Sequence, residues 1–356
     1  MNPRWLVMVA ALLVGAGVAQ PGGPVGPLAL VGMVAMVISL RPLPAPALAG
    51  LGLAALGALA LAMLRALGAE GAPRGAQAVG LWLALAGWAL YLWCVLDVLA
   101  GLQRPKPVRL LAPALLGVAL LYAWEVLVIG WEVTKVLLPA PHAVGDALVA
   151  RWPVLWPDFR QTAVAVIAGW ALGSGAGLAA ALLADRFDFL RRGLLPLAGL
   201  AGAVPIVGIA PIMVMWFGFD WQSKAAVAAV VTFFPMLVNT LAGLASVDAM
   251  HRDLMRTYGA GHAATLMKLR MPSALPFVFN ALKINSTLAL ISAIVAEFFG
   301  SPIVGLGFRI SAEVARMNVD IVWAAIALAA LAGSLFYGLV ALVERVFTFW
   351  HPSYRG

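Results

Sequence analysis

Long apolar runs recur along almost the whole of this 356-residue chain. Several of them reach the roughly 20 residues that an α-helix needs to cross the hydrocarbon core of a bilayer. Because 63% of the residues are hydrophobic and only 11% are charged, an ordinary soluble domain is excluded. The sequence therefore predicts an all-α polytopic membrane protein.

Ten membrane spans are predicted, and each ends where its apolar run meets polar residues, Gly or Pro. They are residues 5–20, 25–40, 43–64, 79–102, 110–129, 158–184, 193–217, 224–245, 273–299 and 321–344. The first run could instead be a signal peptide, because Arg4 precedes a short apolar stretch. We prefer an uncleaved span, because the topology that puts the Lys- and Arg-rich segments on the inner side counts this segment as the first of its spans. The basic segment QRPKPVR (103–109) then separates an N-terminal four-span region (1–105) from the remaining six spans (106–356).

The basic residues indicate how the spans are oriented. The formal charge of +8 could indicate nucleic-acid binding, but the Lys and Arg residues are dispersed among loops, which favours a topological role. With the N-terminus inside, fourteen Lys or Arg fall in inner segments and eight in outer ones, and Lys283 lies within a span. Since cytoplasmic loops are enriched in Lys and Arg, we expect both termini in the cytoplasm.

Small residues and prolines gather in the sixth to ninth spans. Small residues let helix backbones approach closely within a bilayer, which predicts helix packing at Gly169, Gly173, Ser174, Gly175 and Gly177. Pro205 and Pro211 interrupt the seventh span and Pro235 interrupts the eighth. Each predicts a kink or a frayed turn, because proline removes a backbone donor. Simple bending and kinked helices that line a pathway are equally compatible with this pattern.

The longest polar stretch lies between the eighth and ninth spans. Asp248 is a plausible N-cap for a short helix over 249–258. Gly259 and Gly261 should end that helix, since glycine adopts the left-handed backbone conformation without steric cost. A second short helix is predicted over 262–270. The stretch therefore predicts a rigid helix–bend–helix element at the membrane surface, with an ordinary basic loop as the alternative.

This stretch resembles the cytoplasmic coupling loop of ABC-importer permeases, whose signature is Glu-Ala-Ala, three residues, Gly, nine residues and Ile-x-Leu-Pro. Here Gly259 takes the glycine position, and Leu269, Arg270, Met271 and Pro272 follow nine residues later. Pro272 also fits the first turn of the next long helix. The opening triad differs, because Asp253-Leu254-Met255 stands in its place.

The resemblance extends from about Leu138 to the C-terminus and includes three further blocks. They are PIVGIAPIMVMWFG (Pro205–Gly218), FFPMLVNTLAGL (Phe233–Leu244) and LALISAIVAEFFG (Leu288–Gly300). Together they look like the nitrate, sulfonate, taurine and pyrimidine-precursor branch of the binding-protein-dependent, MetI-like (type I) permeases. The first 100 or so residues lie outside the resemblance.

This resemblance implies a fold, a function and partners. The last six spans would form a type I ABC-importer permease core with a cytoplasmic coupling loop at 248–272. The chain would be the permease subunit in a bacterial cytoplasmic membrane, moving a small polar or anionic solute inward. Its partners would be ATP-binding-cassette ATPase subunits, an external substrate-binding protein and a second copy of the permease. ATP and Mg would be bound by the ATPase and not by this chain.

The resemblance also assigns roles within the coupling loop. Arg252, Asp253, Arg256 and Gly259 are the residues expected to sit in a groove on the ATPase. Leu269 and Met271, together with Leu266, would anchor the loop against its own helices, and Pro272 would begin the following span.

Polar groups within the ninth span are candidates for the translocation pathway, because such groups are costly in lipid. Asn280, Lys283 and Thr287 fall on one helix face at i, i+3 and i+7. A lysine there would favour an anionic solute electrostatically. The alternative is a Lys283 paired with a carboxylate inside the bundle, with Glu125 as a possible partner.

Two further polar residues are candidates, although a structural role is preferred for both. Asn239 follows Pro235 and could stabilise a kink through hydrogen bonds. Glu297 lies near the outer end of the ninth span and could serve as an interfacial contact or as a gate.

Motifs for catalysis and metal binding are absent from the sequence. No G-x-x-x-x-G-K-[ST] phosphate loop occurs, so the chain is not expected to hydrolyse ATP. Its four histidines lack metal-ligand spacing, and Cys94 is the single cysteine. An ion-coupled secondary transporter and a membrane-anchoring structural subunit are the alternative functions. The former would need buried carboxylates.

Overall fold

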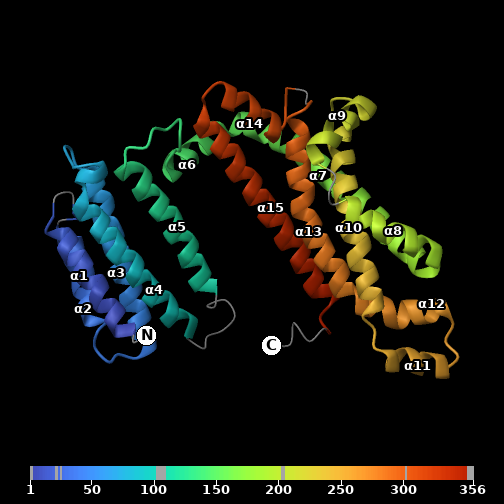
Figure 1. The fold of residues 1–356 in the computed structure, drawn as a ribbon. Coiled ribbons are helices and arrows are strands. Elements are labelled where there is room, and N and C mark those ends of the chain that lie inside the picture. The colour runs from blue at the N-terminus through green and yellow to red at the C-terminus, as the bar shows by residue number, and fades with distance from the viewer. Residues whose placement is uncertain are drawn as a thin grey trace. The chain divides into compact units, whose positions relative to one another are not determined.

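The computed structural model describes residues 3–20, 23–24, 26–101, 110–201, 205–300 and 303–350. Within these ranges all regular secondary structure is helical (Figure 1). The chain divides into two compact units, Met1–Gly145 and Asp146–Gly356. The domain boundary predicted at residue 105, within the basic segment 103–109, lies outside the described residues.

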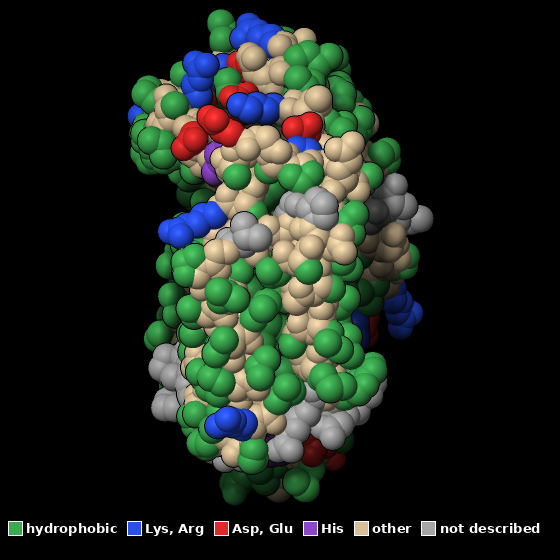
Figure 2. Space-filling view, turned by 90° about the vertical axis from the view of Figure 1, so that its left-hand side faces the viewer, with side chains coloured by type: hydrophobic (Ala, Val, Ile, Leu, Met, Phe, Trp, Pro, Cys, Tyr) green, Lys and Arg blue, Asp and Glu red, His purple; other side chains and the backbone are tan. Residues whose placement is uncertain are grey.

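The first unit consists mainly of apolar helices. They are α1 (Pro3–Val18), α2 (Pro27–Ile38), α3 (Ala45–Gly68), the 3₁₀ turn η1 (Gly75–Gln77), α4 (Val79–Gly101) and α5 (Leu111–Gly130). Helices α1 and α4 cross closely, since a Cβ on Gly17 would lie 2.6 Å from the carbonyl oxygen of Gly80. Figure 2 views the side on which α1 to α4 lie and shows hydrophobic side chains over the middle of this face. Such a band is what a bilayer would cover.

The second unit carries the predicted coupling loop. Helix α6 (Pro141–Ala150) crosses the division between the units. The helices that follow are α7 (Trp152–Arg186), α8 (Asp188–Ala201), α9 (Ile206–Phe217), α10 (Trp221–Ala245), α11 (Ala249–Thr257), α12 (His262–Thr265), the π-helical turn η3 (Leu266–Arg270), α13 (Met271–Glu297), α14 (Leu306–Ala315) and α15 (Val319–Phe347).

Seven helical segments among the described residues are long and apolar enough to cross a membrane. Three shorter apolar helices, at Trp5–Val18, Pro27–Ile38 and Ile206–Phe217, bring the total to ten. The polytopic all-α prediction is therefore confirmed, and α7, α10, α13 and α15 cover the spans predicted at 158–184, 224–245, 273–299 and 321–344.

Two predicted elements are wrong in detail. The span predicted at 193–217 is not one helix but is shared between α8 and α9, and Pro205 before α9 has an extended backbone (φ −69°, ψ 123°). Proline lacks the N–H that a continuous helix would need there. The second short helix at 262–270 is not separate either, because the helical segment runs from His262 to Glu297 through the π-helical turn.

Glycines on one face of α7 allow α10 to pack against it. A Cβ on Gly169 would lie 2.4 Å from that of Ala228, and a Cβ on Gly173 would lie 2.3 Å from the carbonyl oxygen of Ala229. A Cβ on Gly177 would meet α10 at a similar distance, whereas one on Gly175 would meet nothing within 4 Å. The predicted helix packing is therefore confirmed for the glycines at i, i+4 and i+8.

A buried amide joins three helices at the centre of the second unit. The Nδ2 of Asn285, on α13, donates to Ser174 Oγ on α7 at 2.9 Å and to the carbonyl oxygen of Thr232 on α10 at 2.8 Å. Asn285 and Thr232 are fully buried. Figure 1 shows α11 and α12 at one end of this bundle and α14 at the other.

Candidate functional site

Helix α11 begins and ends as its sequence predicts. The Asp248 side chain accepts a hydrogen bond from the backbone N–H of Met250 at 3.4 Å. At the other end, Gly259 has a positive φ of 66°. Its N–H donates to the carbonyl of Arg256, and the N–H of Ala260 donates to that of Met255. These two bonds form a Schellman motif, which needs a left-handed residue at the Gly259 position.

Gly261 does not share this role. Its φ is −68°, and it precedes α12 as the N-cap residue. The prediction that both glycines end α11 through left-handed backbone is therefore wrong for Gly261. The bend itself requires a single glycine.

The charged residues of α11 differ in how they are held. Asp253 and Arg256 form an exposed pair with a 3.4 Å separation, which contributes little to stability. Arg252 instead donates through Nη2 to the carbonyl of Val247, which follows α10, at 2.7 Å. Asp253 and Arg256 are thus available to a partner, whereas Arg252 is bonded to its own chain.

Helix α11 also presents an apolar stripe that was not predicted from the sequence. Met250, Leu254 and Tyr258 recur at i, i+4 and i+8, so they share a face. Leu254 is 51% exposed and Tyr258 is 79% exposed. Met267, on η3, is also exposed. The i, i+4, i+8 spacing was visible in the sequence, and exposed apolar patches of this kind mark interaction sites.

An ion pair that the sequence did not reveal connects η3 to α7. Arg270 donates from Nη1 and Nη2 to the two carboxylate oxygens of Asp185 at 2.8 and 2.6 Å. Its Nε donates to the carbonyl of Leu244, on α10, at 3.1 Å. Bidentate pairs of this kind are strong and directional. The predicted anchors Leu266, Leu269 and Met271, and Pro272 at the start of α13, are half-buried and lie near this pair in the sequence.

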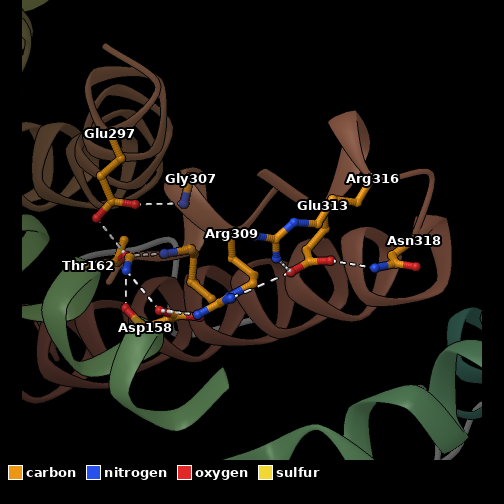
Figure 3. A network of polar contacts seen from close by, with 10 residues as sticks. Asp158, Thr162, Glu297, Gly307, Arg309, Glu313, Arg316 and Asn318 are labelled. Atoms are coloured by element: carbon orange, nitrogen blue, oxygen red, sulfur yellow. Dashed lines mark hydrogen bonds and ion pairs between the residues drawn. The ribbon is translucent and has the colours of Figure 1, made fainter. Parts of the chain in front are cut away.

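At the opposite end of the bundle, side chains from two helices cap α14 (Figure 3). Asp158 and Thr162, on α7, accept from the backbone N–H groups of Gly305 and Leu306, each at 2.9 Å. Glu297, at the end of α13, accepts from the N–H of Gly307 at 2.6 Å and from Thr162 Oγ1 at 2.8 Å. The three donors are ones that a helix N-terminus leaves unpaired.

Charged residues extend this network along α14. Arg309 Nε donates to Asp158 at 2.7 Å, and that hydrogen bond raises the pKa of Arg309. Glu313 accepts from Asn318 Nδ2 at 2.7 Å and from Arg316 at 3.2 Å. The hydrogen bond from Asn318, with the nearby arginines, lowers the pKa of Glu313.

Lys283 is largely buried and lies 2.7 Å from Glu344 on α15. Glu125 is therefore the wrong partner. Its carboxylate instead contacts the imidazole and the backbone N–H of His142. Within a single chain, Lys283 is therefore paired with a carboxylate, as the alternative interpretation predicted. Its role in the translocation pathway stays a prediction.

The other pathway candidates are divided between exposed and structural positions. Asn280 and Thr287 are exposed on α13, and Thr287 lines a cavity of about 630 Å³ between α13 and α15. Asn239 Nδ2 donates to the carbonyl of Pro235 at 2.8 Å, as expected of a residue that stabilises a kink. Glu297 is buried in the cap of α14.

Residues 173–348 match the family described as "Binding-protein-dependent transport system inner membrane component". A probable ABC transporter permease of Haemophilus influenzae is 31% identical over 239 residues, which are 67% of this chain and 97% of that protein. The chain belongs to this permease family. The residues that match the family model include α11, η3 and α14 itself, whereas Asp158 and Thr162 of the α14 cap precede them.

Two further relatives are named for the solutes that they transport. The formylaminopyrimidine transport permease ThiX of Halalkalibacterium halodurans is 32% identical over 52% of this chain and 74% of its own length. A putative aliphatic sulfonates transport permease of Bacillus subtilis is 31% identical over 53% and 68%. The chain is thus a multi-pass membrane protein and the permease subunit of an ABC importer, which implies a complex with an ATPase and a binding protein.

Proposed function

We propose that residues 248–272 form the cytoplasmic surface on which the ATPase subunit docks. The apolar stripe of α11 supports this most directly, because a rigid helix with exposed Met250, Leu254 and Tyr258 is suited to a groove on a partner. Asp253 and Arg256 flank the stripe with exposed charges. In this arrangement both termini lie in the cytoplasm and the membrane is the bacterial inner membrane.

Three connections would carry movement of the ATPase into the spans. The helical segment His262–Glu297 is unbroken, so displacement of α12 moves α13. Arg270 ties the same segment to α7 through Asp185 and to α10 through Leu244. At the far end of α13, Glu297 bonds to the N-terminus of α14. Packed helices that are joined by hydrogen bonds can transmit such displacements as nearly rigid bodies.

The energy for transport would come from the partner subunit. ATP and Mg would be bound and hydrolysed there, and this chain would supply no catalytic site and bind no cofactor. Two copies of the chain would form the pathway. The exposed apolar side chains along the α13–α15 cavity, including Ile291 and Ile326, are a suitable surface for the second copy.

The solute is proposed to be small and polar or anionic. The names of the relatives support this class, since sulfonates are anions and formylaminopyrimidine is a polar heterocycle. Lys283 could attract an anion only when its contact with Glu344 opens. Asn280 and Thr287 would supply hydrogen bonds on the same face of α13.

Co-purification with the ATPase tests the docking proposal. Leu254→Asp places a charge in the apolar stripe and should reduce recovery of the ATPase at least tenfold. Val314→Asp is the matched control, because Val314 on α14 is equally exposed, at 51%, and lies at the other end of the bundle. Full ATPase recovery with Leu254→Asp, or equal loss with both variants, would contradict the proposal.

A further inference from the structure

Basic and aromatic side chains gather where α7 ends and α8 begins. Arg186, Phe187, Phe189, Arg191 and Arg192 are all exposed. Phe189 is 85% exposed and Phe187 is 52% exposed. Residues 186–192 are called the α7–α8 turn below. Neither the docking surface of α11 nor the pathway candidates include any of them.

The turn is held in place by the inner face of α8. Leu190 and Leu194 pack against buried residues of α7 and α10, among them Ala184 and Leu237. Because this face is occupied, the exposed arginines and phenylalanines lie on the remaining surface of the turn. The packing of α8 therefore fixes the positions from which these side chains extend.

The net charge of the turn is positive, with three arginines and one aspartate. Within the described residues, none of the three arginine side chains forms an ion pair; Arg186 lies over the ring of Phe187. Asp188 is the single carboxylate within 186–192. The neighbouring Asp185 is already neutralised by Arg270. Guanidinium groups bind phosphate oxygens through paired hydrogen bonds.

The apolar part of the surface points to a lipid and not to a soluble partner. Leu183 precedes the turn on α7 and is exposed, as are Leu195 and Leu197 on α8. Helix α7 is apolar and long enough to span the membrane. The phenylalanines therefore continue a surface that lipid covers, and the arginines lie at its polar edge. Interfacial lipid-binding segments have this combination of basic and aromatic residues.

We propose that the α7–α8 turn binds the phosphate headgroup of anionic phospholipids, with Phe187 and Phe189 inserted at the boundary of headgroups and acyl chains. Placing this lipid in the cytoplasmic leaflet rests on the proposed function, since Asp185 and Arg270 put the turn beside the coupling segment. A bound lipid would steady the end of α7, to which that segment is clamped.

Lipid titration of the full-length protein tests this proposal without the ATPase. Phosphatidylglycerol and phosphatidylcholine are added to the detergent-solubilised chain, and bound lipids are counted by native mass spectrometry. Each arginine near an anionic surface contributes roughly a fivefold gain in affinity. Arg191→Gln/Arg192→Gln should therefore lower the phosphatidylglycerol affinity about tenfold or more, with little change for phosphatidylcholine.

A matched double variant separates a local site from a general charge effect. Arg65→Gln/Arg151→Gln removes two exposed arginines elsewhere in the chain and should keep the wild-type phosphatidylglycerol affinity. Phe189→Ala, which leaves the charge unchanged, should lower it severalfold. Equal affinities for wild type and Arg191→Gln/Arg192→Gln, or equal losses in both double variants, would overturn the proposal.

The same variants distinguish a lipid from the ATPase as occupant. If Arg191→Gln/Arg192→Gln loses the ATPase on co-purification while its phosphatidylglycerol affinity is unchanged, the turn is a protein contact and the lipid proposal is wrong. Failure of the α11 docking proposal would appear only in the Leu254→Asp experiment. The two outcomes are therefore read separately.

Discussion

At the scale of single residues, Arg270 makes the most connections in the coupling segment. It donates to both oxygens of Asp185 and to the carbonyl of Leu244, so one side chain joins η3 to α7 and α10. Both members of the ion pair are largely buried. Removing either one would leave a desolvated charge without a partner, which is costlier than losing an exposed pair.

The first prediction concerns this pair. Arg270→Gln should lower ATP-driven uptake in proteoliposomes at least tenfold and reduce the thermal unfolding temperature, because Asp185 is left unpaired. Arg270→Lys keeps the charge but lacks the planar fork, so its effects should be intermediate. Arg65→Gln is the control, because Arg65 is exposed and lies outside the coupling segment. Wild-type uptake and stability with Arg270→Gln would contradict the role of the pair.

The second prediction concerns Glu313. Its pKa is lowered from the ordinary value of 4.5 by Asn318 and two arginines, so the folded state binds the proton less readily than the unfolded state. The resulting stability is present above pH 4.5 and is lost as pH falls through the folded pKa.

Thermal unfolding of the solubilised protein between pH 6 and pH 3 measures this contribution. The unfolding temperature of the wild type should fall more steeply on acidification than that of Glu313→Gln. Parallel curves for the two proteins would show that Glu313 contributes no pH-dependent stability.

The sequence identified polar residues in the spans but not their partners. Lys283 stands out because a charge inside a span is rare, yet Glu344 is distant in sequence and no local pattern pairs them. Asp185 and Arg270 are a similar case, as they belong to the ends of two different spans. Contacts between separate helices depend on packing, which periodicity within one helix does not determine.

At the scale of elements, the Schellman end of α11 depends on backbone conformation and not on space. Gly259 has φ 66°, but a Cβ there would meet nothing within 4 Å. Left-handed backbone costs most residues about 1–2 kcal/mol and is forbidding for β-branched ones, whereas Asn tolerates it.

The third prediction follows from this difference. Gly259→Val should abolish uptake while membrane insertion stays intact, and Gly259→Asn should retain most of the uptake. Uptake and surface expression of both variants would be measured in cells. Equal activity of the Val and Asn variants would show that the left-handed bend is not required.

The fourth prediction concerns the packing of α7 against α10. Gly173→Leu should prevent the two helices from approaching, because even a Cβ would lie 2.3 Å from the Ala229 carbonyl. Gly175→Leu is the matched control, since its surroundings are open. We expect a lower unfolding temperature and a lower yield for Gly173→Leu alone. Similar behaviour of the two variants would contradict the close contact.

Helix existence could be predicted far better than helix continuity. Hydropathy and length identified the spans, because a bilayer imposes both. A kink or frayed turn at Pro205 was predicted from the proline, but the division of the span 193–217 into two helices was not. The opposite error occurred at 262–270, where Pro272 lies near the start of α13 and the π-helical turn keeps the helix continuous.

At the scale of the whole molecule, the second unit forms one connected structure from the coupling segment to the cap of α14. The path runs from α11 through α12 and η3 into α13, and ends where Glu297 bonds to Gly307. ATP hydrolysis by an ATPase bound at the coupling segment could thus alter the position of α14 at the opposite end of this unit. The first unit has its own core and lies outside the residues matched by the family.

The most direct test is the sidedness and contact of Tyr258. In a Cys94→Ala background, Tyr258→Cys should react with a membrane-impermeant maleimide only in inside-out vesicles and should crosslink to the ATPase subunit. Val314→Cys, on α14, should react only in right-side-out cells and give no such crosslink. Labelling of Tyr258→Cys from the outside, or absence of an ATPase crosslink in the assembled complex, would contradict the account.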